Sequence, residues 1–266
     1  DTRWLFLNDS LVYHSIYNPN NLRTGGTFDL FLVAPYFNKQ PHVANMALVG
    51  LAAGTVAKQY TAVYGALPID GIEIDPAVVD VGRRYFDMTE PNLNVIVGDG
   101  RWELEQLPGT YSVIGVDAYR PPYIPWQLTT REFFETVRGH LTDDGALAIN
   151  VGRTPSDRRL IEALVGTLKA VFPSVHVVDV PNTGFNSMVY ATVQPTDAAA
   201  LAANLAALPA DAHPLLRAAL TDAVANVQPT PASTTIFTDD WAPVEQYADA
   251  IVLGYFLGGD TSALGR

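Results

Sequence analysis

Three acidic residues of this chain, Glu73, Asp99 and Asp117, each stand at the end of a short apolar segment that reads as a β-strand. In a parallel sheet covered by helices, ligands bind where the strands end. Carboxylates gathered there can accept hydrogen bonds from ribose hydroxyls, hold an ammonium group or take up a proton. The spacing therefore predicts one shared site for a ligand that carries hydroxyl and amino groups.

Glu73 follows Gly50 by 23 residues, which is close to the spacing at which an acidic side chain binds both hydroxyls of a ribose. The alternative is an ordinary carboxylate at the edge of the sheet. Glu73 stands between Ile72 and Ile74 in a strand that we expect to be buried. A buried carboxylate without a ligand would then need a cation nearby.

Asp99 and Asp117 suit two further tasks. Asp99 is followed by Gly100, so its carboxylate can accept from an exocyclic adenine amine while the ring lies against the backbone. The alternative is a simple Asp-Gly turn. Asp117 lies between an apolar strand and the aromatic, proline-rich segment 118–125, a partly dry position that suits a general base or an ammonium ligand. A helix cap or a solvated loop acid is its alternative.

Gly50 and Gly54 flank a turn of small residues, which lets the backbone approach a ligand closely. The dinucleotide pattern G-x-G-x-x-G is not matched, and neither a G-x-S-x-G elbow nor a Walker loop occurs. We predict no metal site, because the chain has no cysteine and its five histidines are scattered. These histidines are His14, His42, His140, His176 and His213.

The elements that must position these residues alternate regularly along the chain. Predicted strands cover 47–50, 71–75, 94–97, 112–116 and 146–151, and predicted helices cover 55–64, 76–85, 130–141 and 157–171. This alternation indicates a parallel sheet with helices on both faces. Strands 175–180 and 188–193 then follow each other without a helix, as at the end of S-adenosylmethionine-dependent transferases. We predict an α/β, Rossmann-like class I methyltransferase fold, with a mostly parallel seven-stranded sheet that ends in an antiparallel hairpin.

Two flanking regions complete the organisation. Residues 3–15 alternate around a turn at 8–10 and predict a small β-hairpin, and residues 198–225 predict two helices. We therefore divide the chain into an N-terminal β-hairpin region, 1–40, and a nucleoside-binding catalytic domain, 41–266.

Composition restricts the class of partner. The 266 residues are 48% hydrophobic and 17% charged, which is enough to bury a sizeable core. The net charge of −12 disfavours nucleic acid and suits a cationic substrate, although many proteins are simply acidic. No apolar run reaches the roughly 20 residues that span a bilayer. The chain starts at Asp1 without a methionine, so we expect an upstream segment outside this sequence, and a membrane segment or signal there stays open.

With these residues in view, the chain resembles the spermidine synthase (polyamine aminopropyltransferase) family, in the branch often fused to membrane transporter-like segments. The stretches that carry the resemblance are 50–55, 71–76, 98–101, 116–119, 123–134 and 239–245. The resemblance covers nearly the whole chain. It implies transfer of an aminopropyl group from decarboxylated S-adenosylmethionine to a diamine such as putrescine, in the cytoplasm and without a metal.

The resemblance also assigns roles to residues. By it, Glu73 binds the ribose, Asp99 and Gly100 bind the adenine, and Asp117 assists removal of a proton from the attacking amine. The remaining assigned residues are Gly50 and Gly54 for the nucleoside and Tyr119 and Gln127 for the amine substrate. Family members commonly pair through their N-terminal β-region, which implies a homodimer.

Three positions depart from the family pattern. Arg120 stands where a second aspartate is typical, Ala53 replaces an aspartate of the turn, and Phe28-Asp29-Leu30 takes the place of a Tyr-His-Glu pattern. Two alternatives therefore stay open. One is a methyltransferase that uses intact S-adenosylmethionine, whose carboxylate Arg120 could pair with. The other is a non-catalytic nucleoside-binding domain of a membrane-linked protein.

Overall fold

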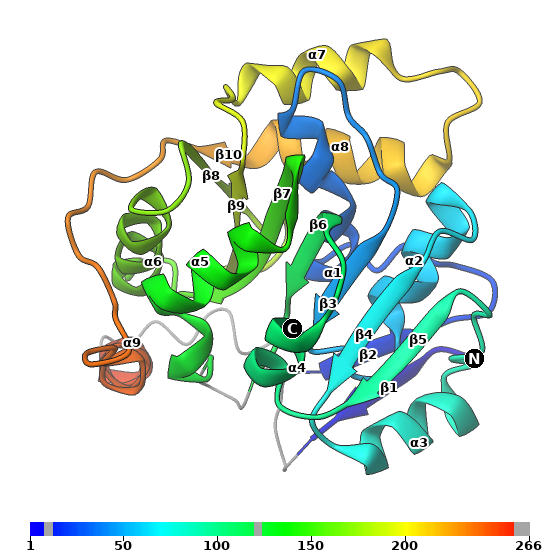
Figure 1. The fold of residues 1–266 in the computed structure, drawn as a ribbon, viewed down its shortest axis with the longest axis horizontal. Helices are drawn as coiled ribbons and strands as arrows, with labels where there is room; N and C mark the ends of the chain where they lie inside the picture. The colour runs from blue at the N-terminus through cyan, green and yellow to red at the C-terminus, as the bar shows by residue number, and fades with distance from the viewer. Residues whose placement is uncertain (8–12, 120–123, 258–266) are drawn as a thin grey trace.

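A computed structural model describes residues 1–7, 13–119 and 124–257 (Figure 1). Its central sheet has the strand order β10-β8-β9-β7-β6-β3-β4-β5. The strands are β3 (Met46–Val49), β4 (Ile69–Glu73), β5 (Leu93–Val97), β6 (Tyr111–Val116), β7 (Leu141–Gly152), β8 (Ser174–Asp179), β9 (Asn186–Thr192) and β10 (Val227–Gln228). β5, β4, β3, β6 and β7 run parallel, whereas β9 is antiparallel to both β7 and β8.

The predicted α/β fold is confirmed, with one strand more than expected. β10 pairs antiparallel with Val177 and Val178 of β8, so the sheet has eight strands instead of seven. A strand of two residues is too short to show an alternation of apolar and polar side chains. β3 lies between β4 and β6, so the strand order reverses beside it. In doubly wound sheets this reversal opens a ligand crevice at the carboxyl ends of the strands.

Helices cover both faces of the sheet. They are α1 (Thr27–Leu30), η1 (Phe31–Phe37), α2 (Thr55–Tyr64), α3 (Pro76–Tyr85), α4 (Gly100–Gln106), η2 (Trp126–Leu128), α5 (Arg131–Gly139), α6 (Arg159–Lys169), α7 (Ala199–Ala207), α8 (Pro214–Asn226) and α9 (Val244–Leu257). α1, η1, α2 and α8 pack on one face, and α4, α5, α6 and α9 pack on the other. Successive residues of β3 show the division, because Leu48 joins the first core cluster and Val49 the second. None of the helices in the described ranges is long and apolar enough to cross a membrane.

The N-terminal strands form a separate two-stranded sheet, as expected. β1 (Arg3–Phe6) pairs antiparallel with β2 (Tyr13–Tyr17), and the predicted turn at 8–10 lies outside the described residues. β2 is attached to the turn that follows β3. The backbone N–H of Ala53 donates to Ser15 Oγ at 3.0 Å, and Thr55 Oγ1 exchanges two hydrogen bonds with the backbone of Ile16 at 2.9 Å each.

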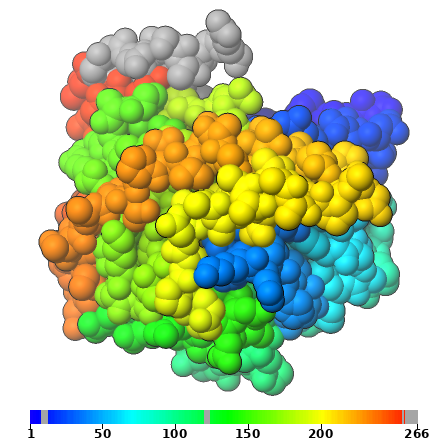
Figure 2. Space-filling model, turned by 90° about the horizontal axis from the view of Figure 1, so that it is seen from above, coloured from blue at the N-terminus to red at the C-terminus, as the bar shows by residue number. Residues whose placement is uncertain are grey.

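The 3-10 helix η1, which follows α1, is buried along its whole length. Its carbonyls and those beside it accept hydrogen bonds from tyrosine hydroxyls, with Tyr190 donating to Leu30 O and Tyr60 to Phe31 O. These bonds matter because a buried backbone group without a partner is costly. Figure 2 shows α7 and α8, in yellow and orange, lying across the blue segment that includes η1.

Candidate active site

The three acidic residues predicted from the sequence lie at one edge of the sheet. β3 pairs in parallel with β4 on one side and with β6 on the other. Gly50, Glu73 and Asp117 each directly follow the last residues that these strands pair with one another, so the three lie in one row. On β5, Val97 pairs with Glu73, and Asp99 follows Val97 by two residues. The structure therefore brings the carboxyl ends of four adjacent strands together as expected.

The turn after β3 needs glycine at both predicted positions. Gly50 has φ +93°, and a Cβ there would lie 2.5 Å from the carbonyl oxygen of Asp117. Gly54 has φ +86°, and its Cβ would lie 2.7 Å from the side chain of Met88. Ala52 between them also has a positive φ, +47°, a conformation that costs a residue with a side chain on the order of 1–3 kcal/mol. The turn is thus held tightly against the end of β6.

Glu73 is held by backbone amides. Its Oε2 accepts from Ala52 N at 2.8 Å and its Oε1 accepts from Asp75 N at 3.1 Å. Burial raises the pKa of Glu73, and these hydrogen bonds offset part of the rise. The alternative of a Glu73 without a ligand therefore needs no cation, because two backbone N–H groups already stabilise the carboxylate. Ile74 was expected to be buried but is 69% exposed, since β4 ends at Glu73 and turns outward.

Asp99 caps helix α4, which the sequence did not predict. Its Oδ1 accepts from the backbone N–H groups of Arg101 at 3.0 Å and Trp102 at 3.1 Å, while Oδ2 has no donor among the described residues. Gly100 begins the helix, and a Cβ there would lie 2.5 Å from Val49 Cγ1. Among the described residues, Oδ2 is thus the oxygen of Asp99 that keeps its accepting capacity.

Asp117 is the most perturbed of the three carboxylates. Its backbone N–H donates to Val49 O at 2.8 Å, and its Oδ1 accepts from Asn150 Nδ2 at 2.9 Å. Burial raises the pKa of Asp117 from 3.8 to about 6, although the hydrogen bond from Asn150 lowers it. A carboxyl group with this pKa is ionised at neutral pH and remains a stronger base than a solvated aspartate.

The two predicted amine contacts differ: the side-chain hydroxyl of Tyr119 is engaged within the protein, whereas Gln127 is held through its backbone oxygen. The hydroxyl of Tyr119 donates to the backbone oxygen of Asn150 at 3.0 Å, and burial raises its pKa well above the ordinary value. Gln127 lies in η2, and its backbone oxygen accepts from Arg101 Nη1 at 3.2 Å. Arg120 lies outside the described residues.

The segment that replaces the Tyr-His-Glu pattern lies in the core. Asp29 is 2% exposed, and its carboxylate accepts from the backbone N–H groups of Thr24 and Gly25, from the Thr24 hydroxyl and from Gln59 Nε2. Ala53 is 1% exposed. Asp29 is therefore saturated by its own surroundings and shapes the loop before α1.

Sequence reasoning missed the amides beside Asp117. Asn150 is 8% exposed in β7, and its Oδ1 accepts from Asn186 Nδ2 at 2.9 Å. The only local signal was a polar residue in the apolar strand predicted at 146–151, and that signal does not reveal its partner.

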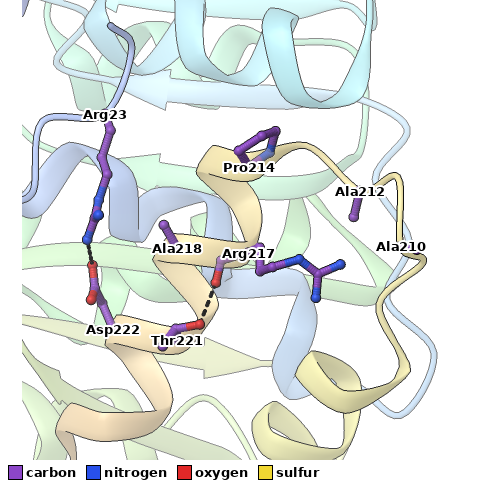
Figure 3. Close-up of a pocket in the computed structure, with 8 residues that line it drawn as sticks. All are labelled: Arg23, Ala210, Ala212, Pro214, Arg217, Ala218, Thr221 and Asp222. Atoms are coloured by element: carbon purple, nitrogen blue, oxygen red, sulfur yellow. Dashed lines mark hydrogen bonds and ion pairs between the residues drawn. The ribbon is translucent and has the colours of Figure 1, made fainter.

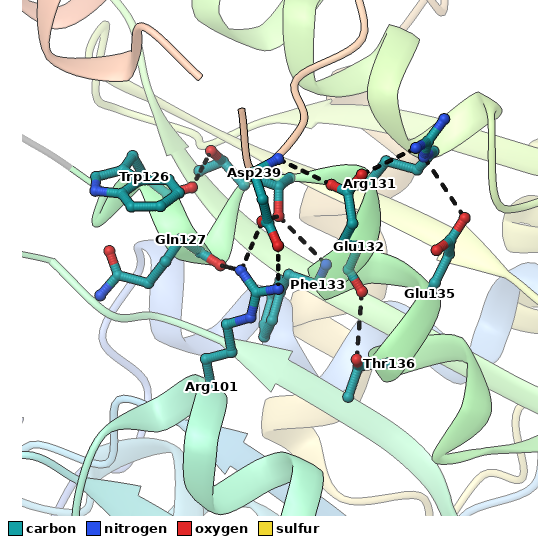
Figure 4. Close-up of polar contacts among 11 residues, drawn as sticks. Arg101, Trp126, Gln127, Arg131, Glu132, Phe133, Glu135, Thr136 and Asp239 are labelled. Carbon is teal, nitrogen blue, oxygen red and sulfur yellow. Dashed lines mark hydrogen bonds and ion pairs between the residues drawn. The ribbon is translucent and has the colours of Figure 1, made fainter. Parts of the chain in front are cut away.

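Sequence reasoning also missed an ion pair between helix α4 and the segment before α9 (Figure 4). Arg101 of α4 donates from Nη1 and Nη2 to the two carboxylate oxygens of Asp239 at 2.7 and 2.6 Å. The Thr130 hydroxyl donates to the same carboxylate at 2.7 Å, and Asp239 N donates to Glu132 Oε2 at 3.0 Å. These bonds attach the segment before α9 to the helix that Asp99 caps. They lower the pKa of Asp239 and raise that of Arg101.

Two surface pockets lie away from this edge of the sheet. One of about 410 Å³ lies between the segment before α1 and helix α8, where Arg23 and Asp222 form an ion pair at 2.9 Å (Figure 3). Another, of about 610 Å³, lies beside β8 and β10. In the part of the chain that the structure describes, no cluster of three or more histidine, aspartate or glutamate side chains could hold a metal ion.

The fold and the strand-end carboxylates define the Rossmann-like class that spermidine synthases and S-adenosylmethionine-dependent methyltransferases share. A probable spermidine synthase from Corynebacterium glutamicum superposes with a TM-score of 0.63 at 20% identity, over 84% of this chain and 88% of that one. Human methyltransferase-like protein 13, in complex with SAH, superposes with a TM-score of 0.57 at 21% identity, over 78% of this chain and 93% of that one. These likenesses establish the fold alone.

The sequence comparison is more specific. A model of the spermine/spermidine synthase domain family matches residues 49–202, and the chain belongs to this family. It is 38% identical over 165 residues to a probable polyamine aminopropyl transferase of Bifidobacterium longum, which covers 60% of this chain. The chain spans 36% of that relative's length. The matched region contains the candidate site from Gly50 to Asn186.

Proposed function

We propose that this chain transfers an aminopropyl group from decarboxylated S-adenosylmethionine to an amine acceptor such as putrescine. The observation that carries the proposal is Asp117, a partly buried carboxylate of raised pKa at the same edge of the sheet as Glu73 and Asp99. Membership of the spermine/spermidine synthase domain family supports it.

In this reaction the acceptor nitrogen attacks the carbon next to the sulfonium sulfur. The new C–N bond forms as the C–S bond breaks, and methylthioadenosine leaves. An ammonium group has no lone pair, so a group must bind it and remove its proton. Asp117 is suited to this task, because one of its oxygens is held by Asn150 and its carboxylate is ionised above a pH of about 6.

The other two carboxylates suit the nucleoside half of the donor. Each oxygen of Glu73 accepts one backbone hydrogen bond and retains a lone pair for a ribose hydroxyl. Oδ2 of Asp99 has no donor among the described residues, which supports a role in accepting from the adenine amine, and Gly100 adds no side chain that would keep the ring from the backbone. Holding donor and amine in line supplies much of the rate enhancement in such displacements.

Turnover and binding together test the proposal. We expect the chain to form methylthioadenosine from decarboxylated S-adenosylmethionine and putrescine, with a rate that falls as the pH drops through about 6. Asp117→Asn should lower kcat by roughly 10²- to 10⁴-fold while the Kd for methylthioadenosine changes less than about tenfold. The matched control is Asp211→Asn, at an exposed position, which should leave both unchanged.

Calorimetry separates the alternatives. Tighter binding of S-adenosylhomocysteine than of methylthioadenosine would contradict aminopropyl transfer and favour a methyltransferase. Nucleoside binding without turnover of any amine would instead indicate a non-catalytic domain. The division of the chain into regions 1–40 and 41–266 and the fusion to membrane segments stay predictions.

We further propose a homodimer formed through the outer face of the β1–β2 sheet. Trp4 and Phe6 are each 52% exposed there and Tyr13 is 37% exposed, an apolar face that favours burial against a second copy. Sedimentation should show a dimer for the wild type and a monomer for the Trp4→Ser, Phe6→Ser double variant. A wild-type monomer at micromolar concentration would contradict the proposal.

A further inference from the structure

Asn150 connects the end of β6 with the β8–β9 hairpin. Its side-chain Nδ2 donates to Asp117 Oδ1, its Oδ1 accepts from Asn186 Nδ2, and its backbone oxygen accepts from the Tyr119 hydroxyl. The two side-chain bonds are 2.9 Å long and the third is 3.0 Å. One asparagine therefore contacts three residues at the same edge of the sheet, two that follow β6 and one at the start of β9.

We propose that Asn186 and Asn150 form a two-amide relay that orients Asp117 for proton removal from the acceptor amine. Both are positioning residues, and the proposal rests on the proposed function of Asp117. The side chain of Asn186 donates a hydrogen bond to Asn150, and its effect on Asp117 passes through Asn150.

The proposed relay depends on the asparagine side chain having an accepting oxygen and a donating NH₂ group. An asparagine side chain can present either its oxygen or its NH₂ group to a neighbour. The oxygen of Asn150 facing Asp117 would repel the carboxylate, whereas the NH₂ group stabilises it. By donating to the oxygen of Asn150, Asn186 fixes that oxygen on its own side and leaves the NH₂ group on the side of Asp117.

The hydrogen bond also selects which oxygen of Asp117 reacts. Oδ1 is occupied by Asn150, and Oδ2 has no donor among the described residues. Fixing one oxygen holds the carboxylate in a single rotamer, so that Oδ2 meets the amine in the same geometry at each turnover. An amide neither gives nor takes a proton near neutral pH, so it does not compete for the proton that Asp117 removes.

The relay is anchored on the hairpin side. Arg153 is 9% exposed at the end of β7, and it donates from Nε to Ser187 Oγ at 3.0 Å and from Nη1 to Gly184 O at 3.0 Å. It also forms an ion pair with Asp179 at 3.3 Å. These contacts hold both sides of the β8–β9 turn, and therefore the position of Asn186.

Few charged groups among the described residues complicate the titration of Asp117, and Arg120 lies outside these residues. From its own segment Tyr119 faces it, and β4 contributes Glu73 at the same edge of the sheet. β3 ends there in Gly50, and β7 contributes the neutral Asn150. Arg153, directly after β7, forms an ion pair with Asp179 of β8, and Asp179 also pairs with Arg158.

A titration of Asp117 by ¹³C NMR tests the relay directly, on the folded chain without substrate. Asn150→Ala should raise the pKa of Asp117 by about one unit, because the charged form loses its donor. Asn186→Ala should raise it less, since Asn150 can then turn over. Asn94→Ala is the control, because Asn94 donates to Asp70 at 2.7 Å near the start of β4 and β5, away from the strand ends that carry the site, and it should cause no shift. An unchanged pKa in Asn150→Ala would overturn the proposal.

Kinetics then separate a relay from two independent contacts. We expect kcat to fall about 100-fold in Asn150→Ala and about tenfold in Asn186→Ala, with the acid limb of the pH profile moved upward and the Kd for methylthioadenosine unchanged within about twofold. The double variant should be no slower than Asn150→Ala. Multiplying effects of the two substitutions would overturn the relay.

If no amine is turned over, the proposed function fails, and the NMR titration still decides whether the relay exists. Should Asn150→Ala not fold, Asn186→Ala provides the same test.

Discussion

Replacing Asp117 by asparagine is expected to stabilise the protein at neutral pH while it removes the proposed activity. The carboxylate is partly buried, it receives one hydrogen bond, from Asn150, among the described residues, and burial raises its pKa from 3.8 to about 6. An asparagine at this position retains an oxygen for that hydrogen bond and carries no charge. Stability is commonly sacrificed in this way where a functional group must stay reactive.

The size and sign follow from the shift in pKa. Because the pKa of the folded state is the higher one, Asp117 favours the folded state most below a pH of about 4, and this contribution is lost as the pH rises through about 6. A shift of roughly two units, at about 1.36 kcal/mol each, amounts to about 3 kcal/mol. Partial solvent access reduces this value, so 3 kcal/mol is an upper bound on the gain in Asp117→Asn at pH 8, or about 5 °C in Tm.

Urea and thermal unfolding of ligand-free protein between pH 4 and pH 8 provide the assay. The stability difference between Asp117→Asn and wild type should be near zero at pH 4 and should grow to its full value by pH 7. Asp211→Asn, at an exposed position between α7 and α8, controls for the loss of one negative charge and should stay within about 0.5 kcal/mol of wild type. Equal stabilities at pH 8, or a gain independent of pH, would refute the assignment of a desolvated carboxylate.

Three further substitutions test the rest of the site. Glu73→Gln turns an NH₂ group toward a backbone N–H and should weaken methylthioadenosine binding about 10- to 100-fold by calorimetry, so unchanged affinity would contradict a ribose contact. Arg101→Met removes a bidentate pair with the partly exposed Asp239 and should cost about 1 kcal/mol, with faster amide exchange around Asp239 as its signature. Gly50→Ala should cost about 1–3 kcal/mol in unfolding free energy and lower kcat, because its Cβ would lie 2.5 Å from a carbonyl oxygen at the end of β6. Gly65→Ala has a similar φ of +82° but no neighbour within 4 Å, so equal losses of kcat in both variants would show that the close approach is unimportant.

Elements that depend on neighbouring residues could be predicted from the sequence. The helices predicted at 55–64 and 76–85 have those bounds in α2 and α3, and Asp75 caps α3 by accepting from Ala77 N at 2.8 Å. Short apolar strands and caps are local signals, because the side chains involved lie within a few residues of each other. The order of these elements was enough to predict the sheet and the edge at which Glu73, Asp99 and Asp117 lie together.

Elements that depend on distant partners could not be predicted. β10 exists because β8 offers it an edge, and α4 is a helix of seven residues whose cap, Asp99, resembled a simple turn. Asp29 lies in the segment that takes the place of the family's Tyr-His-Glu pattern, and its carboxylate is saturated by the loop before α1 and by Gln59. No local pattern distinguishes a carboxylate that is saturated internally from one that faces a ligand.

The sequence by itself determined the sheet, the tight turn at Gly50 and the acidic residues that end its strands, because each depends on side-chain periodicity and backbone sterics over short stretches. Only the tertiary structure decided what those acidic residues contact. Asn150 reaches Asp117 across 33 positions and Arg101 reaches Asp239 across 138. Hydrogen bonds and ion pairs act over about 3 Å in space regardless of separation along the chain, so their partners are known only once the chain has folded.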